Sequence, residues 1–284
     1  MNYNIYFKQQ IYQIIDKKIY NISFRYLSDK ELNIVYNALK INNTFKYLDL
    51  KNNNIDNLLS LYKAIINNHS LIFLNLFSNY INDLTLMSDI ININSLQELI
   101  LSDNKIESIK PICKALETSI SLKSLDLSGN NIKDLLLLYN ALKNNKSLKK
   151  LFLNKNNIKD LLLLSEGLKD NNTLELISLC ENQIEDITPL SNMLKINNSL
   201  KIISLGENQI KKVDKLGEVL LYNNSLQEIF LNDNEINNVL LLNYALLFNK
   251  SIKYIDLSGN KIKNPVLLYS IIEINTNLIQ YILF

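Results

Sequence analysis

Side chains that could act as nucleophiles or general bases are few in this chain. His69 is the single histidine, so a Ser-His or Cys-His pair has no other histidine to serve as its base. We expect His69 to lie in a surface turn. None of the spacings CxxC, HExxH, GxxxxGK[ST] or GxGxxG occurs, so metal, protease, phosphate-loop and dinucleotide sites have no motif. The sequence therefore predicts no catalytic, cofactor-binding or metal-binding residues, and a protein that is not an enzyme.

Asparagine is the polar side chain that recurs at a fixed spacing. A segment such as LKSLDLSGNNI, at 122–132, returns every 26 residues, with one spacing of 25. Its ninth position is Asn in nine copies: Asn53, Asn79, Asn104, Asn130, Asn156, Asn182, Asn208, Asn234 and Asn260. An amide both donates and accepts hydrogen bonds, so it can hold a backbone that turns away from a strand. We interpret these residues as a structural asparagine ladder.

The elements that position this ladder follow from the apolar residues around it. Leu or Ile fills the fourth, sixth and eleventh positions of most copies, and alternation over so short a span is a strand's period. The skeleton LxxLxLxxNxI over residues 45–284 resembles the leucine-rich repeat family. Segments ending in forms such as ALKxNxSL are similar to its ribonuclease-inhibitor-like subclass, whose repeat is usually longer.

The resemblance implies an α/β fold, a right-handed leucine-rich-repeat solenoid or horseshoe. Each repeat would be a strand followed by a helix of about three turns. Parallel strands lie about 4.8 Å apart, whereas packed helices are about 8–10 Å apart. The stack must therefore bend, with parallel strands on the concave face and α-helices on the convex face.

Two regions differ from the regular repeats. Residues 1–44 are predicted to form an N-terminal cap, with an amphipathic helix near residues 5–17, a degenerate repeat, and a capping box at Ser28 and Glu31. Residues 45–284 are predicted to hold nine complete repeats and a tenth that stops after its strand, LIQYILF. This strand leaves an unpaired sheet edge. We expect either an incomplete chain or a homodimer that pairs through this edge.

Polar residues mark both ends of the expected helices. The thirteenth position carries Asn, Asp or Ser in all but one complete copy, which predicts N-capping side chains. Several Asn-x-Ser/Thr triplets occur where the helices end, including those that begin at Asn68, Asn171, Asn197 and Asn223. We interpret these asparagines as helix caps in the left-handed conformation, and the alternative is N-glycosylation. Small residues such as Ala141 and Gly167 are expected to let the helix and strand layers approach.

Charge indicates which classes of partner to expect, and the cysteines indicate the cellular compartment. The net charge is +2, and Arg25 is the single arginine, which disfavours nucleic acid and acidic membranes. Cys113 and Cys180 fall in different parts of different repeats, so a disulfide between them is implausible. No signal sequence or membrane-length apolar run is visible. We expect a soluble cytoplasmic protein.

Positions three, five, seven and eight of each repeat are predicted to form the concave surface. Two phenylalanines flank smaller residues there, which predicts a shallow apolar trough with an acidic row at position eight. Solvent-facing apolar clusters often mark a binding site, although these side chains can instead pack on each other. The predicted partner-binding residues are Phe152, Leu176, Ser178, Cys180, Glu181, Ile202, Ser204, Glu207, Phe230 and Asp233.

These features predict a non-enzymatic scaffold that binds another protein through its concave face, and the acidic row predicts a partner with a basic surface. One alternative is a regulator of a small GTPase, since Ran GTPase-activating proteins are similar in subclass. Arg25 lies in the cap, so no arginine-finger candidate occurs on the concave rim. Another alternative is a substrate-recruiting module of a larger assembly.

Overall fold

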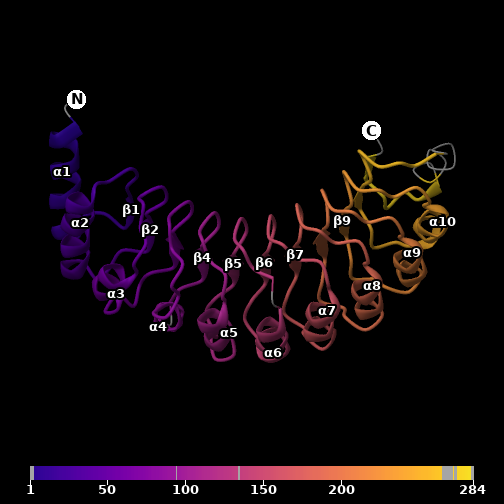
Figure 1. Ribbon diagram of the computed structural model, residues 1–284, viewed down its shortest axis with the longest axis horizontal. Helices are drawn as coiled ribbons and strands as arrows, with labels where there is room; N and C mark the ends of the chain where they lie inside the picture. The colour runs from indigo at the N-terminus through magenta and orange to yellow at the C-terminus, as the bar shows by residue number, and fades with distance from the viewer. Residues whose placement is uncertain (1–2, 94, 134, 264–270, 272–273, 283–284) are drawn as a thin grey trace. The chain divides into compact units, whose positions relative to one another are not determined.

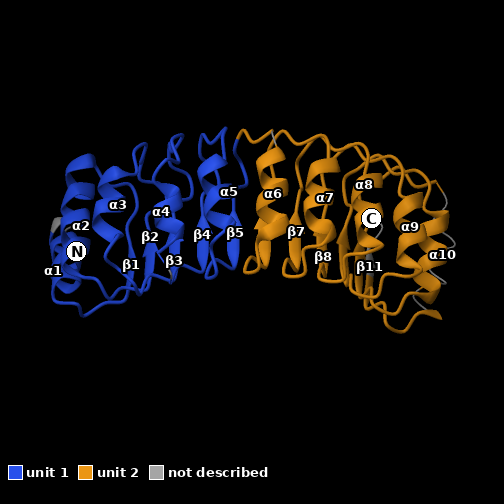
Figure 2. Cartoon of the chain, turned by 90° about the horizontal axis from the view of Figure 1, so that it is seen from below, with its two compact units in different colours: residues 1–130 blue, residues 131–284 orange. Residues whose placement is uncertain are grey.

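The structure, a computed structural model, describes residues 3–93, 95–133, 135–263, 271 and 274–282. The chain divides into two compact units, residues 1–130 and residues 131–284, which have different colours in Figure 2. Both units repeat the same motif of a short strand followed by a helix.

The strands of each unit form a parallel sheet in which sequential strands are neighbours. In unit 1 they are β1 (Asn21–Ser23), β2 (Tyr47–Asp49), β3 (Phe73–Asn75), β4 (Glu98–Ile100) and β5 (Ser124–Asp126). In unit 2 they are β6 (Lys150–Phe152), β7 (Leu176–Ser178), β8 (Ile202–Ser204), β9 (Glu228–Phe230), β10 (Tyr254–Asp256) and β11 (Gln280–Ile282). Within each unit the strands lie on one side and the helices on the other (Figure 1). The predicted α/β solenoid of parallel strands and helices is therefore confirmed in each unit.

The described helices that follow β2 to β9 are shorter than the three turns predicted for the repeats. Unit 1 contains α1 (Tyr3–Ile15), α2 (Asp29–Ile41), α3 (Leu59–Ile65), α4 (Met87–Ile91) and α5 (Lys110–Leu116). Unit 2 contains α6 (Leu136–Asn144), α7 (Leu162–Lys169), α8 (Thr188–Leu194), α9 (Asp214–Leu220) and α10 (Leu240–Phe248). From α3 onward these helices have five to nine residues. None of the described helices has the length and apolar character needed to cross a lipid bilayer.

Strand alternation places the core on one side of the sheet. In unit 2 the fourth-position side chains are paired in register between neighbouring strands, and each is at most 2% exposed. They are Leu151, Ile177, Ile203, Ile229 and Ile255. Burial of such a side chain contributes about 1.5–3 kcal/mol, so this row stabilises the packing of the sheet on its core. Third- and fifth-position side chains must point the other way.

The observed helix starts show that one detail of the sequence prediction is wrong, namely the position of the capping side chains. Asp160 Oδ1 accepts a hydrogen bond of 2.7 Å from the N–H of Leu162, the first residue of α7, and Asn57 bonds in the same way at α3. The side chain therefore lies one residue before the N-cap position and acts through a turn. Asp134 and Asn264, predicted in the same role, lie outside the described residues.

The first 44 residues contain α1, β1 and α2, and β1 extends the sheet of unit 1 by pairing with β2. The predicted capping box is present, because Ser28 N–H donates to Glu31 Oε2 at 2.9 Å and Glu31 N–H donates to Ser28 Oγ at 3.4 Å. The rings of Phe7 on α1 and Phe24 after β1 meet edge to face, 5.6 Å apart. The boundary between cap and repeats at 44/45 stays a prediction.

Candidate partner-binding surface

The candidate surface is the face of the unit 2 sheet that points away from the core. We call it the open face and define it by positions three, five, seven and eight of the repeats that contain β6–β10. Strand pairing arranges its side chains in two rows. One row is Lys150, Leu176, Ile202, Glu228 and Tyr254, and the other is Phe152, Ser178, Ser204, Phe230 and Asp256.

The apolar members of the open face are less exposed than the sequence analysis expected. Phe152, Leu176, Ile202 and Phe230 were predicted to face solvent, but each is half-buried. Adjacent strands lie about 4.8 Å apart, so neighbouring side chains in one row cover each other's flanks. Part of each side chain is therefore buried against its neighbours in the row. The outer surface of each remains available to a partner.

Two small residues of the predicted site are held by Asn154. Ser178 Oγ donates to Asn154 Oδ1 at 2.6 Å, and the N–H of Cys180 donates to the same oxygen at 2.8 Å. Ser178 is buried and Cys180 is half-buried, whereas Ser204 is half-buried. Burial raises the pKa of the Cys180 thiol, so it stays protonated at neutral pH. Ser178 therefore supports the surface and does not offer a free hydroxyl to a partner.

The acidic residues at position eight are exposed and have an unusual backbone conformation. Glu181, Glu207 and Asp233 have φ values of 51°, 54° and 52°, in the left-handed region that glycine adopts most easily. Each donates its N–H to a carbonyl of the following repeat, at 2.8–3.0 Å. Lys155 forms an ion pair of 3.9 Å with Glu181. The turn thus directs a row of carboxylates along one rim of the open face.

Three aromatic or acidic residues of the open face were not among the predicted partner-binding residues. The ring of Tyr254 lies against that of Phe230, with centroids 4.9 Å apart and planes at 36°. Glu228 and Asp256 occupy the same two strands. Burial and then the charges of Asp256 and Glu228 raise the pKa of Tyr254. Tyr254 and Asp256 occupy the same positions one repeat further along the chain, and Glu228 is at position three of the repeat that contains Phe230, so reading every position of both repeats would have found all three.

The asparagine ladder bonds to the backbone and not to the open face. Asn208 Nδ2 donates to the carbonyls of Leu179 and Leu205, both at 3.0 Å, and its Oδ1 accepts from the N–H of Ile184 at 3.1 Å. The residue thereby joins two repeats. The other ladder residues also donate their amides to backbone carbonyls: Asn53, Asn79, Asn104, Asn130, Asn156, Asn182, Asn234 and Asn260.

The asparagines of the Asn-x-Ser/Thr triplets form a second ladder at the helix ends. Asn197 Nδ2 donates to the carbonyls of Leu168 and Asn171, at 2.8 and 2.7 Å, and its Oδ1 accepts from Leu200 N–H. The asparagines named for this prediction are each at most 4% exposed, and none has a positive φ: Asn68, Asn171, Asn197 and Asn223. The predicted left-handed cap is therefore wrong. Glycosylation is also disfavoured, because a glycan would displace these buried amide hydrogen bonds.

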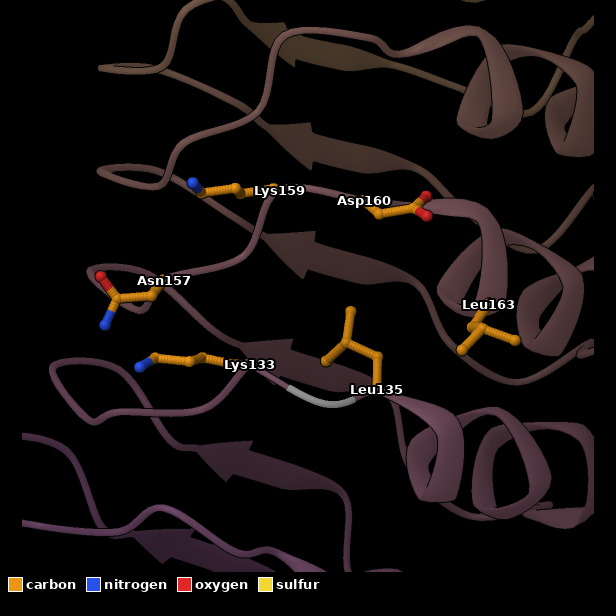
Figure 3. A pocket seen from close by; sticks show the side chains of 6 residues that line it. All are labelled: Lys133, Leu135, Asn157, Lys159, Asp160 and Leu163. Atoms are coloured by element: carbon orange, nitrogen blue, oxygen red, sulfur yellow. The ribbon is translucent and has the colours of Figure 1, made fainter.

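A cavity of about 330 Å³ lies away from the open face, between the strand-to-helix segments of two repeats (Figure 3). It is lined by Lys133, Leu135, Asn157, Lys159, Asp160 and Leu163. The Asp160 carboxylate is already bonded at the start of α7, and the lining includes no cysteine, serine or histidine. This cavity offers two ammonium groups beside leucine side chains.

The helices of unit 2 also expose leucine side chains, which the sequence analysis did not anticipate. The exposed residues are Leu136, Leu137, Leu162, Leu163, Leu240 and Leu241, on α6, α7 and α10. Each pair directly follows a buried residue at the helix start, as Leu135 precedes Leu136. The chain therefore presents a second apolar surface, on the side of the helices.

The histidine, the arginine and the two cysteines lie apart in the sequence and in different repeats. His69 is exposed in the turn after α3, and Arg25 is exposed directly after β1, both in unit 1. Cys113 is buried and Cys180 is half-buried, and no disulfide joins them. Among the described residues there is no group of three or more His, Cys, Asp or Glu side chains that could hold a metal ion.

Comparison with known proteins adds the following similarities. Residues 118–135 and 248–265 match the profile of a family described as Leucine Rich repeat. The crystal structure of internalin C2 from Listeria monocytogenes is 24% identical, with a TM-score of 0.55 over 73% of this chain and 78% of that one. Another internalin of that species, InlF, is 20% identical over 93% of this chain and 87% of its own, with a TM-score of 0.47. No curated protein sequence matches the chain.

Proposed function

We propose that this chain, whose fold is that of the leucine-rich repeat proteins, is a scaffold that binds another protein through the open face of unit 2. It performs no chemistry of its own in this function. Its finer placement in the ribonuclease-inhibitor-like subclass stays a prediction.

The observation that carries the proposal is the composition of the open face. Half-buried Phe152, Ile202 and Phe230 offer apolar contact area, and aromatic residues are typical anchors of protein interfaces. From β7 to β10 the open face has five carboxylates and no lysine. These are Glu181, Glu207, Glu228, Asp233 and Asp256. A partner with a basic surface would complement this charge.

The acidic rim lies on a turn whose backbone conformation recurs at position eight of the repeats. A residue other than glycine in the left-handed region costs on the order of 1 kcal/mol, and Gly129 and Gly259 show that glycine occupies this position in other repeats. Glu207 and Asp233 adopt the conformation nonetheless. Asn52, Ser78 and Lys155 adopt it at the same position, so the conformation belongs to the repeat, and the support for binding comes from the exposed carboxylates that it carries in unit 2.

The other roles expected from the sequence have less support. A regulator of a small GTPase would present a residue to the nucleotide, and Arg25 lies far along the sequence from the open face, in unit 1. A recruiting role, a homodimer through β11 and a cytoplasmic location stay predictions. Nothing among the described residues favours any of them over the scaffold.

The proposal is tested by affinity capture from a lysate of the source organism. The wild-type protein is compared with a Phe152→Asp, Ile202→Asp, Phe230→Asp variant that keeps the wild-type circular dichroism spectrum. We expect the variant to lose a protein that the wild type retains, because three carboxylates would replace the apolar contacts of the open face.

A matched control carries the same change of charge on the helices, with Leu137→Asp, Leu163→Asp and Leu241→Asp. We expect this control to keep the partner. Loss of the partner from the control alone would place the binding surface on the helices and refute the proposal.

A further inference from the structure

Strands β9 and β10 place two aromatic rings and two carboxylates in a square on the open face. Glu228 is paired with Tyr254, and Phe230 with Asp256, across the same two strands. The rings therefore meet along one diagonal, with centroids 4.9 Å apart. Strand spacing and rise put the two acidic residues about 8 Å apart along the other diagonal. We call these four residues the acidic-aromatic square.

The carboxylates of the square have no cationic side chain paired with them in the part of the chain that the structure describes. Neither Glu228 nor Asp256 belongs to any ion pair among the described residues. Asp256 Oδ1 accepts the N–H and Oγ–H of Ser258, at 2.9 and 2.7 Å. By contrast, Glu175, at position two, is bonded by Lys149 and Lys201, which hold its pKa below the usual range.

Nearby residues strengthen the negative field at the square. The exposed Asp233 lies in the turn after β9, and its Oδ1 lies over Gly259 in the turn after β10. Glu207 is exposed after the preceding strand. No lysine occupies an open-face position in the repeats of β8, β9 or β10. An ammonium or guanidinium group at this place would therefore meet carboxylates on several sides.

Two carboxylates beside a pair of aromatic rings in contact are a good match for arginine. The planar guanidinium group stacks on aromatic faces and donates to carboxylates through a fixed fork of N–H groups. It is also less strongly hydrated than an ammonium group, so it is more readily desolvated against a ring. A lysine would satisfy the charge but would gain less from the rings.

We propose that the acidic-aromatic square binds an arginine side chain presented by a basic segment of the partner protein. This inference rests on the proposed function, and it names one anchor of that interface. The aliphatic part of the arginine would lie toward Ile202, which neighbours Glu228 in the same row.

The test uses a labelled hexa-arginine peptide and a hexa-citrulline peptide, measured by fluorescence anisotropy at physiological ionic strength. Citrulline keeps the shape of arginine without its charge. We expect the wild type to bind the arginine peptide more tightly. The Glu228→Gln, Asp256→Asn double variant should bind it about tenfold more weakly, which corresponds to about 1.4 kcal/mol. Equal binding of the two peptides by the wild type would overturn the inference.

A charge-matched control separates the square from the field of the whole protein. Glu166→Gln with Glu185→Gln removes two exposed carboxylates elsewhere in unit 2. We expect this control to bind hexa-arginine nearly as the wild type does. An equal loss in both double variants would show long-range attraction only and would refute the square as a site.

The rings are tested separately. Tyr254→Leu should weaken hexa-arginine binding about threefold, whereas Tyr254→Phe, which keeps the ring, should not. Equal binding by these two variants, or tighter binding of a hexa-lysine peptide by the wild type, would reject arginine stacking. If capture on the open face succeeds while hexa-arginine does not bind, the scaffold function stands and this inference alone fails.

Discussion

At the scale of single residues, asparagine supplies most of the buried polar side chains among the described residues. The amides at position nine bond the turns that follow the strands, and a second ladder bonds the segments that follow the helices. Buried backbone groups need partners when a chain leaves a strand or helix. Two stacked ladders provide these partners in repeat after repeat, which is why asparagine recurs at two fixed registers.

Replacement of one ladder residue should therefore be costly. Asn208→Ala would leave the carbonyls of Leu179 and Leu205 and the N–H of Ile184 without this partner. Because buried polar groups would lose hydrogen bonds, we expect the free energy of unfolding in urea to fall by about 3 kcal/mol. The exposed Asn172→Ala should change it by less than about 0.5 kcal/mol. Equal effects of the two substitutions would mean that the ladder contributes little.

At the scale of elements, the close approach of neighbouring helices depends on two glycines. A Cβ atom at Gly167 of α7 would lie 2.9 Å from the carbonyl oxygen of Tyr139 on α6. At Gly217 of α9 it would lie 2.6 Å from backbone atoms of Leu241 and Leu242 on α10. Small residues were expected to bring helices close to strands, but these glycines bring helices close to each other.

We predict that Gly217→Ala destabilises the protein although alanine favours helices. The new methyl group meets backbone that must move, and such overpacking costs about 2 kcal/mol, more than the gain in helix propensity of up to about 1 kcal/mol. Thermal unfolding monitored by circular dichroism would show a lower midpoint. Asn192→Ala, at an exposed position of α8, serves as the control and should leave the midpoint nearly unchanged. A raised midpoint for Gly217→Ala would contradict this account of the helix contact.

The strands and helices could be predicted because each repeat carries the same pattern of residue types. Leu and Ile at positions four and six identify a strand and its buried face, and the register then follows from the period. The partial burial of Phe152 and the hydrogen bonds of Ser178 depend on neighbours in adjacent strands, which periodicity does not describe. The Phe230 and Tyr254 contact joins two repeats, so a reading of single repeats did not find it.

At the scale of the whole molecule, a small net charge conceals a strongly uneven distribution. The chain carries +2, yet the open face from β7 to β10 has carboxylates and no lysine. Two lysines, Lys133 and Lys159, instead line the cavity near α7. Two surfaces are therefore candidates for the interface with a partner protein. The open face combines aromatic, aliphatic and acidic groups, whereas the helices present mainly leucines.

The most direct test of the central claim is site-specific photocrosslinking in a lysate of the source organism. A benzoylphenylalanine replaces Ile202 on the open face in one protein and Leu163 on α7 in another. We predict a covalent adduct with a partner protein from position 202 and none from position 163. An adduct from position 163 with none from position 202 would contradict the account and place the interface on the helices.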